Sequence, residues 1–403
     1  MIRFLTAGES HGKALTSIIE GFPSNIPLKK DYFDFHLKRR QAGYGRSARM
    51  KIENDTLELL SGLRFGKTLG SPISLLIKNN DWKNWGDILN PEKKSSSIHK
   101  VSIPRPGHAD LTGTIKYNFD DIRNSIERSS ARETAARVAA GSVARRFLEE
   151  FGITVGSYVE SIGGVYEKSN YKEKLLNDFS YNKLDVVRLS SNADLSSVRV
   201  LDAEQEKKII NKIKLAKKKG DSLGGTFVVI ATGLPTGLGS FIQYDRKIDA
   251  DIASVIMSIN AVKGVEIGSG FECAESFGSQ VHDEIIIEDN NFQRKTNRAG
   301  GVEGGITTGM PIIVTAAMKP IATLSSPLRT VDLKTMKKTT ARYERSDFVA
   351  VPACSVIAES MLAWVIAKHF LVKFGGDSLE ETRDNYNLYT KRSFKRIQKN
   401  FRK

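Results

Sequence analysis

The sequence predicts a mixed α/β or α+β fold without a strong domain boundary, and three observations support this. The chain has 403 residues, of which 40% are hydrophobic, so it can bury a sizeable core. Segments with helical periodicity and segments with strand-like composition both occur along it. They do not alternate regularly, which argues against a doubly wound or barrel fold built from repeated βαβ units.

Three segments have the apolar spacing of helices. Residues 130–152 begin with Ser130, which is followed three residues later by Glu133, the signature of a capping box. Residues 355–374 end at a pair of glycines, and glycine readily adopts the left-handed conformation found after a helix C-terminus. A third helix is expected over residues 29–41.

Strands are expected where β-branched residues cluster between Gly, Pro, Asn or Asp. Four such runs are ISLLIKN, GGTFVVIATG, DEIIIED and MPIIVTAAM. Residues 166–184 are polar with charges of both signs, which indicates a surface excursion or a helical insert. Neither this segment nor any other has the composition of a Pro/Gly/Ser linker between domains.

The chain is strongly basic, with a formal net charge of +15. Such a charge attracts an anionic partner, which could be a nucleic acid, a membrane surface or a small polyanion. The last thirteen residues, KRSFKRIQKNFRK, contain cations and no acid. We interpret residues 382–403 as a flexible basic tail, and a specific nucleic-acid arm is the weaker alternative.

Membrane insertion, export and disulfide formation are not expected. The opening MIRFLTAGESHG lacks the apolar core of a signal peptide, and the run MLAWVIAKHFLV is interrupted by charge. Cys273 and Cys354 have no CxxC spacing, so buried reduced thiols are expected. The chain is therefore predicted to be a soluble protein of the cytoplasm.

Two of the six histidines have unusual surroundings. His11 lies in GESHG and His108 in PGHAD, both of which are loop sequences of small residues. Imidazole exchanges protons near neutral pH, so both side chains are candidates for acid–base chemistry, with the capping of a turn as the alternative. His108 and Asp110 are only two residues apart and no third ligand has a recognisable spacing, so no metal site is predicted.

Arginines form a second group of candidates. Arg39, Arg40, Arg46 and Arg49 occur within KRRQAGYGRSARM. The planar guanidinium binds carboxylate and phosphate through two hydrogen bonds, so this cluster suits a small molecule with several anionic groups. A solvated basic surface is the alternative.

The start of the helix at Ser130 places a cation where the helix dipole is unfavourable for it. Arg132 falls in the first turn, so we expect a negative group to compensate its charge. Together with Arg128, Ser129 and free backbone N–H groups, Arg132 could bind phosphate or carboxylate. Ordinary capping by the serines is the alternative.

Two further segments have suggestive composition. Residues 300–309, GGVEGGITTG, allow close backbone approach to a ligand, although they lack the P-loop and dinucleotide-binding patterns, and tight turns would explain them as well. In ARYERSDFVAVPA, Arg345 precedes Asp347 by two residues. A surface ion pair is the commoner explanation of that spacing.

In their order along the chain these motifs resemble the chorismate synthase family. The resemblance covers residues 1–381, taken as one catalytic domain, and rests on GESHG, RRQAGYGRSARM, RPGHADLTG, ERSSARETAARVAAG, GDSLGG, SINAVKGVEIG, NRAGGVEGG, KPIAT, ERSDFVAVPA and FGGDSLEE. It implies a β-α-β sandwich, in which central helices are layered between antiparallel sheets, and a homotetramer.

The implied activity is that of a lyase of the shikimate pathway, in aromatic amino acid biosynthesis. It converts 5-enolpyruvylshikimate 3-phosphate to chorismate by 1,4-elimination of phosphate. Reduced FMN is required although there is no net redox change. Because the chain shows no extra domain linked to flavin reduction, the expected source of reduced flavin is an external flavin reductase, with NADPH as an indirect reductant.

The resemblance also assigns roles to residues. His11 would protonate or stabilise the departing phosphate, His108 would face the reduced flavin, and Asp347 would act through flavin N5 as the base. The implied substrate contacts are Arg40, Arg46, Arg49 and Arg132, although the region of Arg40 and Arg46 is also connected with NADP in this family. The implied FMN contacts are Arg128, Ser129, Ser130, Asn260, Ala261, Gly304, Lys319, Pro320, Ile321, Ala322, Thr323 and Arg345.

Some features fall outside the family motifs. The lysine- and serine-rich residues 75–100 and the basic tail are both expected to lie away from the site. The tail keeps nucleic-acid binding open as a weaker function. An ordinary flavin oxidoreductase is the other alternative, and it would consume one equivalent of reductant per turnover.

Overall fold

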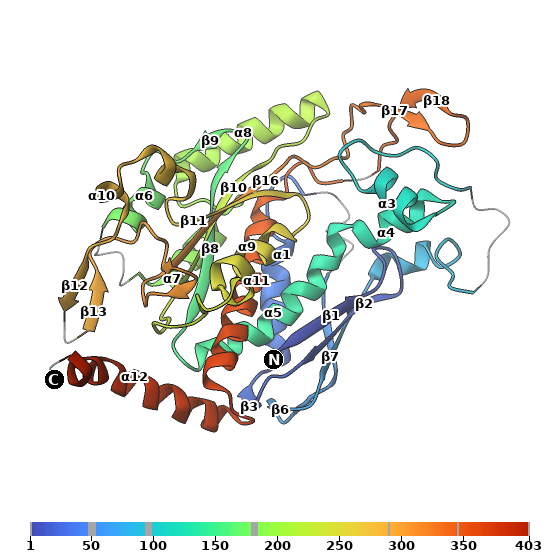
Figure 1. Ribbon diagram of the computed structural model, residues 1–403. Coiled ribbons are helices and arrows are strands. Elements are labelled where there is room, and N and C mark those ends of the chain that lie inside the picture. The colour runs from blue at the N-terminus through green and yellow to red at the C-terminus, as the bar shows by residue number, and fades with distance from the viewer. Residues whose placement is uncertain are drawn as a thin grey trace.

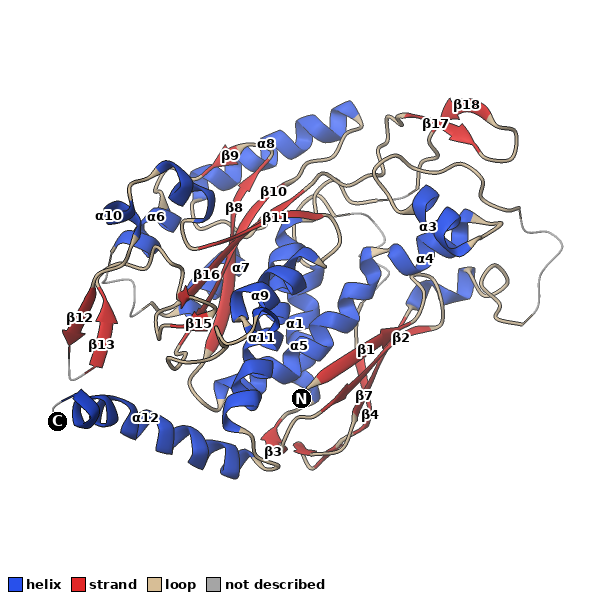
Figure 2. Ribbon diagram, in the orientation of Figure 1, coloured by secondary structure: helices blue, strands red, loops and turns tan. Residues whose placement is uncertain are grey.

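A computed structural model describes residues 2–46, 54–92, 99–178, 184–288, 291–344 and 346–401. Within this part of the chain two antiparallel sheets enclose a layer of helices (Figures 1 and 2). One hydrophobic cluster runs from the first sheet through the helices to the second sheet. The predicted α+β class and the helices layered between antiparallel sheets are therefore confirmed.

The first sheet has four strands. In spatial order they are β1 (Arg3–Ala7), β2 (Ala14–Glu20), β7 (Ile73–Lys78) and β4 (Leu57–Ser61). Alternate residues such as Leu15, Ile19 and Leu75 are buried against the helices, which is the pattern of a sheet with one covered face. A small sheet beside it contains β3 (Ser24–Pro27), β6 (Lys67–Leu69) and β5 (Leu63–Arg64).

The second sheet has five strands and is covered on both faces. In spatial order they are β11 (Val262–Ile267), β16 (Ile312–Met318), β10 (Gly225–Thr232), β8 (Thr154–Ile162) and β9 (Val165–Tyr166). Phe227 and Val229 of β10 point to the helix layer, whereas Val228 and Ile230 belong to a second cluster on the outer face. There α6 (Tyr171–Asn177) and α7 (Val186–Leu195) cover the sheet, so the polar residues 166–184 include a helical insert.

Four helices form the central layer. They are α1 (Lys30–Gln41), α5 (Thr134–Glu149), α9 (Ile248–Met257) and α11 (Val351–Phe374). α11 is apolar and long enough to cross a membrane, but most of it is buried. It packs against α1, α5, α9 and the second sheet, and Figure 2 shows it in the central layer. It is the core helix of the domain, as expected for a soluble protein. It begins four residues before the predicted start because Pro352 fits the first turn of a helix.

The remaining elements surround this core. The helices are α3 (Asp110–Tyr117), α4 (Ile122–Ser129), α8 (Ala203–Lys219), α10 (Gly278–Val281) and α12 (Leu379–Phe401), and short 3-10 turns cover Asn80–Asn84, Ala131–Glu133, Tyr244–Arg246 and Gly270–Glu275. Three hairpins pair β12 (Ile285–Glu288) with β13 (Asn291–Arg294), β14 (Val302–Glu303) with β15 (Ile306–Thr307), and β17 (Arg329–Asp332) with β18 (Lys337–Thr340).

The C-terminal segment differs from the expected flexible tail. Residues 379–401 form α12, which runs along the periphery of the molecule (Figure 1). The segment contains neither Gly nor Pro, and Glu380 and Glu381 in its first turn suit the helix dipole. Tyr386 packs against Phe370 and Phe374 of α11, with ring centroids 5.4 and 5.3 Å apart. Composition alone missed this docking because it does not reveal which aromatic residues meet.

The two cysteines are free. Cys354 is buried in α11, as expected, and burial raises the pKa of its thiol to about 12. Cys273 is only half-buried, so the prediction of burial was wrong for this residue. Its position in the turn at Gly270–Glu275 places it near the surface rather than in either sheet.

A buried ionic cluster lies at the centre of the helix layer. Glu359 of α11 has a fully buried carboxylate that binds Arg39 of α1 (2.7 Å), Arg145 of α5 (2.7 Å) and Arg199 (3.2 Å). Burial raises the pKa of Glu359, but the charges of Arg39 and Arg145 outweigh burial and hold the pKa well below its ordinary value. One carboxylate therefore fixes two helices and the Arg199 segment to α11.

Replacing Glu359→Gln should lower the free energy of unfolding by about 3–5 kcal/mol, because three arginines lose their buried partner. The folded pKa lies below the unfolded value, so the contribution of Glu359 is complete above pH 4.5 and is lost as the pH falls. Urea denaturation at pH 7 and pH 4 measures both effects. The variant should lose less stability between these pH values than the wild type.

The matched control is Glu303→Gln, which breaks a surface pair with Arg294 (2.9 Å). It should change the free energy of unfolding by less than about 1 kcal/mol. An equally large loss in this control, or an unchanged acid sensitivity in Glu359→Gln, would contradict the role of Glu359.

Candidate active site

His11 is held by a carboxylate and by an aromatic ring. Gly8, just after β1, has a φ of 108°, and a Cβ there would lie 2.3 Å from the carbonyl oxygen of Ala14, so this turn requires glycine. The turn brings His11 Nδ1 to 3.0 Å from Glu127 Oε1 of α4. The imidazole also stacks on Trp85, with ring centroids 3.9 Å apart.

The partner of His11 determines which nitrogen can exchange a proton. Burial raises the pKa of Glu127, but hydrogen bonds from His11 and the charge of Arg123 outweigh it, so the pKa lies below its ordinary value. Glu127 is therefore an acceptor at neutral pH, and Nδ1 of His11 carries the proton. Nε2 remains as the nitrogen available for proton transfer.

His108 has the same arrangement in a second loop. Gly107 has a φ of 78° in the preceding turn, and His108 Nδ1 lies 2.6 Å from Asp110 Oδ1. Asp110 is buried and also binds Arg105 through two contacts of 2.8 and 3.0 Å. Burial raises the pKa of Asp110, but the hydrogen bonds from His108 and Arg105 keep it below its ordinary value. Asp110 thus orients His108 as Glu127 orients His11.

The predicted substrate arginines form one cluster. Arg40 and Arg132 share the buried carboxylate of Asp55, at 3.3 and 2.5 Å, and Arg46 pairs with Asp347 at 2.8 Å. Burial disfavours the charged guanidinium of Arg40; although Asp55 opposes this effect, the pKa falls to about 10. Arg40 therefore stays charged at neutral pH, in a buried cluster suited to anions.

The negative group expected beside Arg132 is Asp55, which belongs to the chain itself. The expected capping box does not form, because Ser130 Oγ accepts from the N–H of Arg132 (3.3 Å) instead of that of Glu133. The first turn is a tighter 3-10 turn. The carboxylate of Glu133 binds Thr6 and Arg137, at 2.8 and 2.9 Å, so it does not return to the N-cap.

A few polar contacts join the arginine cluster to the His11 loop. Asn79, directly after β7, accepts from Arg132 Nε (2.9 Å) and donates to the carbonyl oxygen of Gly12 (2.7 Å). Ser130 Oγ donates to Ser10 Oγ at 3.0 Å. These contacts place His11 on the same side of the helix start as the arginines. His11, Arg40, Arg46, Arg132 and Asp347 thus belong to one connected group.

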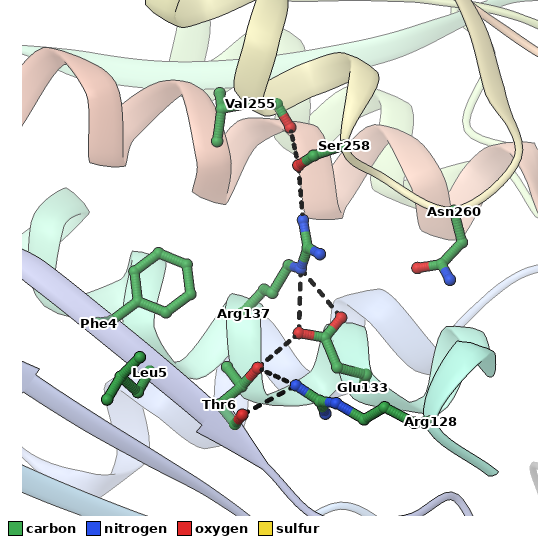
Figure 3. A pocket seen from close by; sticks show the side chains of 9 residues that line it. All are labelled: Phe4, Leu5, Thr6, Arg128, Glu133, Arg137, Val255, Ser258 and Asn260. Atoms are coloured by element: carbon green, nitrogen blue, oxygen red, sulfur yellow. Dashed lines mark hydrogen bonds and ion pairs between the residues drawn. The ribbon is translucent and has the colours of Figure 1, made fainter. Parts of the chain in front are cut away.

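Some of the predicted FMN contacts surround a pocket of about 440 Å³ (Figure 3). Arg128 and Asn260 line it, together with Phe4, Leu5, Thr6, Glu133, Arg137, Val255 and Ser258. Arg128 binds Thr6 (2.8 Å), while Asn260 Nδ2 donates to the carbonyl oxygen of Ser129 (3.0 Å). The pocket therefore lies where β1, the α4–α5 junction and the turn after α9 meet.

The residues around this pocket are suited to a flavin mononucleotide. The buried Oδ1 of Asn260 has no hydrogen-bond partner in the described part of the chain, so an acceptor is available. Ala261 has a φ of 68°, a strained value for alanine that commonly marks a functional turn. Arg128 adds a cation for phosphate, and Phe4 and Leu5 add apolar surface.

The KPIAT segment connects this turn with the His108 loop. The backbone N–H of Lys319 donates to Ala261 (2.9 Å), and its Nζ donates to the carbonyl oxygen of Gly107 (2.6 Å). Thr323 accepts from Arg105 Nη1 at 3.0 Å. Residues 319–323 therefore join the predicted FMN contacts at 260 and 261 to His108.

Gly304 does not join this group. Gly304 lies in the β14–β15 turn, and its neighbour Gly305 contacts Ile248 at the start of α9, whereas Asn260 follows the end of that helix. Ten helical residues, about 15 Å, separate the two ends. Arg49 and Arg345 lie outside the described residues.

Sequence reasoning overlooked the partners that orient the predicted residues. Residues 75–100 were expected to lie away from the site, but Trp85 stacks on His11 and Asn79 binds Arg132, so this prediction was wrong. The tryptophans of DWKNWGD, unusual in so polar a segment, were an available signal. No signal in the sequence marked Asp55 and Glu127, because their roles depend on contacts between distant segments.

The site has no metal-binding group in the described ranges. No set of three or more His, Cys, Asp or Glu side chains within them is arranged to hold a metal ion. The histidines are held by carboxylates and an arginine network instead, which suits proton transfer and anion binding.

Replacing Asp55→Asn should destabilise the protein by about 3 kcal/mol, because Arg40 and Arg132 lose the charge that they share. Inorganic phosphate should then raise the thermal midpoint more in the variant than in the wild type, because it supplies the missing charge. Thermal unfolding in phosphate and in chloride of equal ionic strength measures this. The control Glu284→Gln alters the surface pair with Lys295 (2.9 Å). Equal stabilisation of all three proteins would contradict an anion site here.

Comparison with known proteins agrees with this arrangement. The chorismate synthase family model matches residues 2–371. The chorismate synthase of Chloroherpeton thalassium is 53% identical over 396 residues, covering 97% of this chain and 100% of that protein. That of Aquifex aeolicus is 54% identical over 390 residues, covering 96% and 97%.

The fold comparison gives the same result. A solved structure described as the crystal structure of chorismate synthase has a TM-score of 0.78 and 45% sequence identity, and the match covers 98% of both chains. The chain therefore belongs to the chorismate synthase family, the reduced-FMN-dependent lyases of the shikimate pathway.

Proposed function

We propose that this chain converts 5-enolpyruvylshikimate 3-phosphate to chorismate in the cytoplasm, by 1,4-elimination of phosphate and a ring hydrogen. The observations that support this best are the two histidine–carboxylate pairs and the cluster of buried arginines with Asp347. A reaction that expels phosphate and removes a proton from a substrate with two carboxylates and a phosphate needs these three kinds of group.

The arginines would bind and orient the substrate. Its two carboxylates and its phosphate suit Arg40, Arg46 and Arg132, and we assign Arg49 to the same site from its motif. Asp55 is bound to Arg40 and Arg132, so it holds two guanidinium groups in place before an anion arrives. Such preorganisation reduces the cost of aligning the reacting bonds.

His11 would stabilise the departing phosphate. Its Nδ1 is bound to Glu127, so its Nε2 is the atom that would donate a proton as the carbon–oxygen bond breaks. Before this transfer both ring nitrogens carry a proton, and Glu127 would stabilise the positive charge of that imidazolium form. The stack on Trp85 limits the rotation of the ring, which keeps this donor in one direction.

Asp347 would accept the ring proton, so that the elimination is balanced: one carbon–oxygen and one carbon–hydrogen bond break and a double bond forms. Its ion pair with Arg46 (2.8 Å) orients the carboxylate. Reduced FMN would lend electron density to the reaction and regain it, which explains the requirement for a flavin without net redox change.

We assign the flavin to Arg128, Ser129, Ser130, Asn260, Ala261 and the segment 319–323. His108 would face it, because Lys319 joins the Ala261 turn to the loop of His108. Gly304 and Arg345 are assigned from the motifs alone. We also propose a homotetramer that depends on an external flavin reductase, with NADPH acting only as an indirect reductant.

The decisive assay combines the protein with 5-enolpyruvylshikimate 3-phosphate and dithionite-reduced FMN without oxygen. Phosphate and chorismate should form in equal amounts, and many turnovers should occur per reduced flavin. NADPH with oxidised FMN should give no product until a flavin reductase is added. Absence of phosphate release with reduced FMN would refute the function, and consumption of one reductant per turnover would indicate an oxidoreductase.

His108→Ala and Asp347→Asn should each lower kcat by about 10²–10⁴-fold, because each removes a group that moves or balances a proton. The Kd of the substrate should change by less than about fivefold in His108→Ala. Single-turnover kinetics and substrate titration separate the two effects. His282→Ala, in the segment before β12, is the matched control and should keep wild-type rates. A loss confined to substrate affinity would contradict the catalytic roles.

A further inference from the structure

Glu344 occupies the junction between the two histidine–carboxylate pairs. Its Oε1 lies 3.1 Å from Arg123 Nη1 and its Oε2 lies 3.4 Å from Arg105 Nη1, and Arg342 contacts it as well. Arg123 is also 3.4 Å from Glu127, the partner of His11. Arg105 binds Asp110, the partner of His108.

These contacts form one continuous chain of opposite charges from one histidine to the other. It runs from His11 through Glu127, Arg123, Glu344, Arg105 and Asp110 to His108. Together with Arg342, it contains three arginines and three carboxylates, whose formal charges balance. Each of these arginines contacts a carboxylate that is also bound to another of these side chains. The contacts therefore restrain all of the side chains in the series.

Glu344 also precedes Asp347 by three residues, and Asp347 pairs with Arg46. The segment that carries the proposed base is therefore tied at Glu344 to both histidine loops and at Asp347 to the arginine cluster. No motif used for the family resemblance assigns a role to the side chain of Glu344 or to Arg123.

We propose that Glu344 is a positioning residue for the elimination, which sets the placement of His11, His108 and Asp347 relative to one another through Arg105 and Arg123. This inference rests on the proposed function. The carboxylate of Glu344 contacts Arg105, Arg123 and Arg342, so it acts through these arginines.

Trp85 links Arg123 to His11, so it can transmit a shift of Arg123 to the imidazole. The guanidinium of Arg123 lies 5.0 Å from the centre of the Trp85 ring, and the imidazole of His11 stacks on the same ring. A shift of Arg123 after loss of Glu344 would therefore disturb both the carboxylate and the aromatic contact of His11. Displacements of about 1 Å at such groups can cost 10²-fold in rate.

The test compares Glu344→Gln with the wild type under anaerobic conditions with reduced FMN. We expect kcat to fall about 10- to 100-fold, while the KM for 5-enolpyruvylshikimate 3-phosphate changes less than about threefold. Glu344→Asp keeps the charge on a shorter side chain and should recover part of kcat. The control Glu303→Gln removes a carboxylate from the surface pair with Arg294 and should leave kcat unchanged.

A double-mutant cycle tests whether Glu344 acts through Arg123. If it does, Glu344→Gln and Arg123→Gln together should lower kcat little more than either alone. Additive losses, or wild-type kcat in Glu344→Gln, would overturn the proposal. So would parallel losses of kcat and FMN affinity without recovery in Glu344→Asp, because these indicate a general structural role.

Failures of the two proposals can be told apart. If the wild type forms no chorismate, the proposed function fails. If the wild type is active but the Glu344 variants behave as the Glu303 control, only the positioning role fails. Should Glu344→Gln not fold, as judged by circular dichroism, Arg123→Gln and Glu344→Asp still decide the matter through kcat and KM.

Discussion

The molecule depends on the carboxylate of Glu359, which lies in the middle of the helix layer and binds three arginines from α1, α5 and the segment before α8. Burying these charges is costly unless every partner is present, so the cluster permits one packing of the helices and penalises others. α1 uses consecutive residues for two purposes. Arg39 binds Glu359, whereas Arg40 turns to Asp55 and the anion cluster. The orientation of a proposed substrate arginine is therefore set by the core.

The fold class was predictable because composition and periodicity are local signals. The helix 355–374, the strand runs and the absence of regular βαβ alternation pointed to a mixed α/β or α+β domain, and the layered arrangement was implied by the family resemblance. What could not be predicted was contact between distant segments. A flexible tail was expected at the C-terminus, but that segment is a helix whose Tyr386 packs against Phe370. A capping box was expected at Ser130, but a tight 3-10 turn follows it.

The candidate site was predictable only in part, because the reactive residues could be recognised in the sequence and the residues that orient them could not. Residues that present chemistry, such as His11 and His108, stood out because small loop residues surround them. Residues that orient them did not, since Glu127 and Asp55 look like ordinary acids until the chain folds. Trp85 is intermediate, because its polar context was visible but its stack on His11 required the structure. Residue type thus predicts what a site can do, while tertiary contacts determine how it is held.

The contacts between Asn79, Arg132 and Gly12 bring together stretches of chain that lie more than fifty residues apart. No contiguous fragment shorter than most of the chain contains the complete group, so the group is complete only in the folded molecule. Binding competence is therefore a property of the folded molecule. A ligand held there stabilises the whole domain by mass action and distinguishes finished chains from compact intermediates.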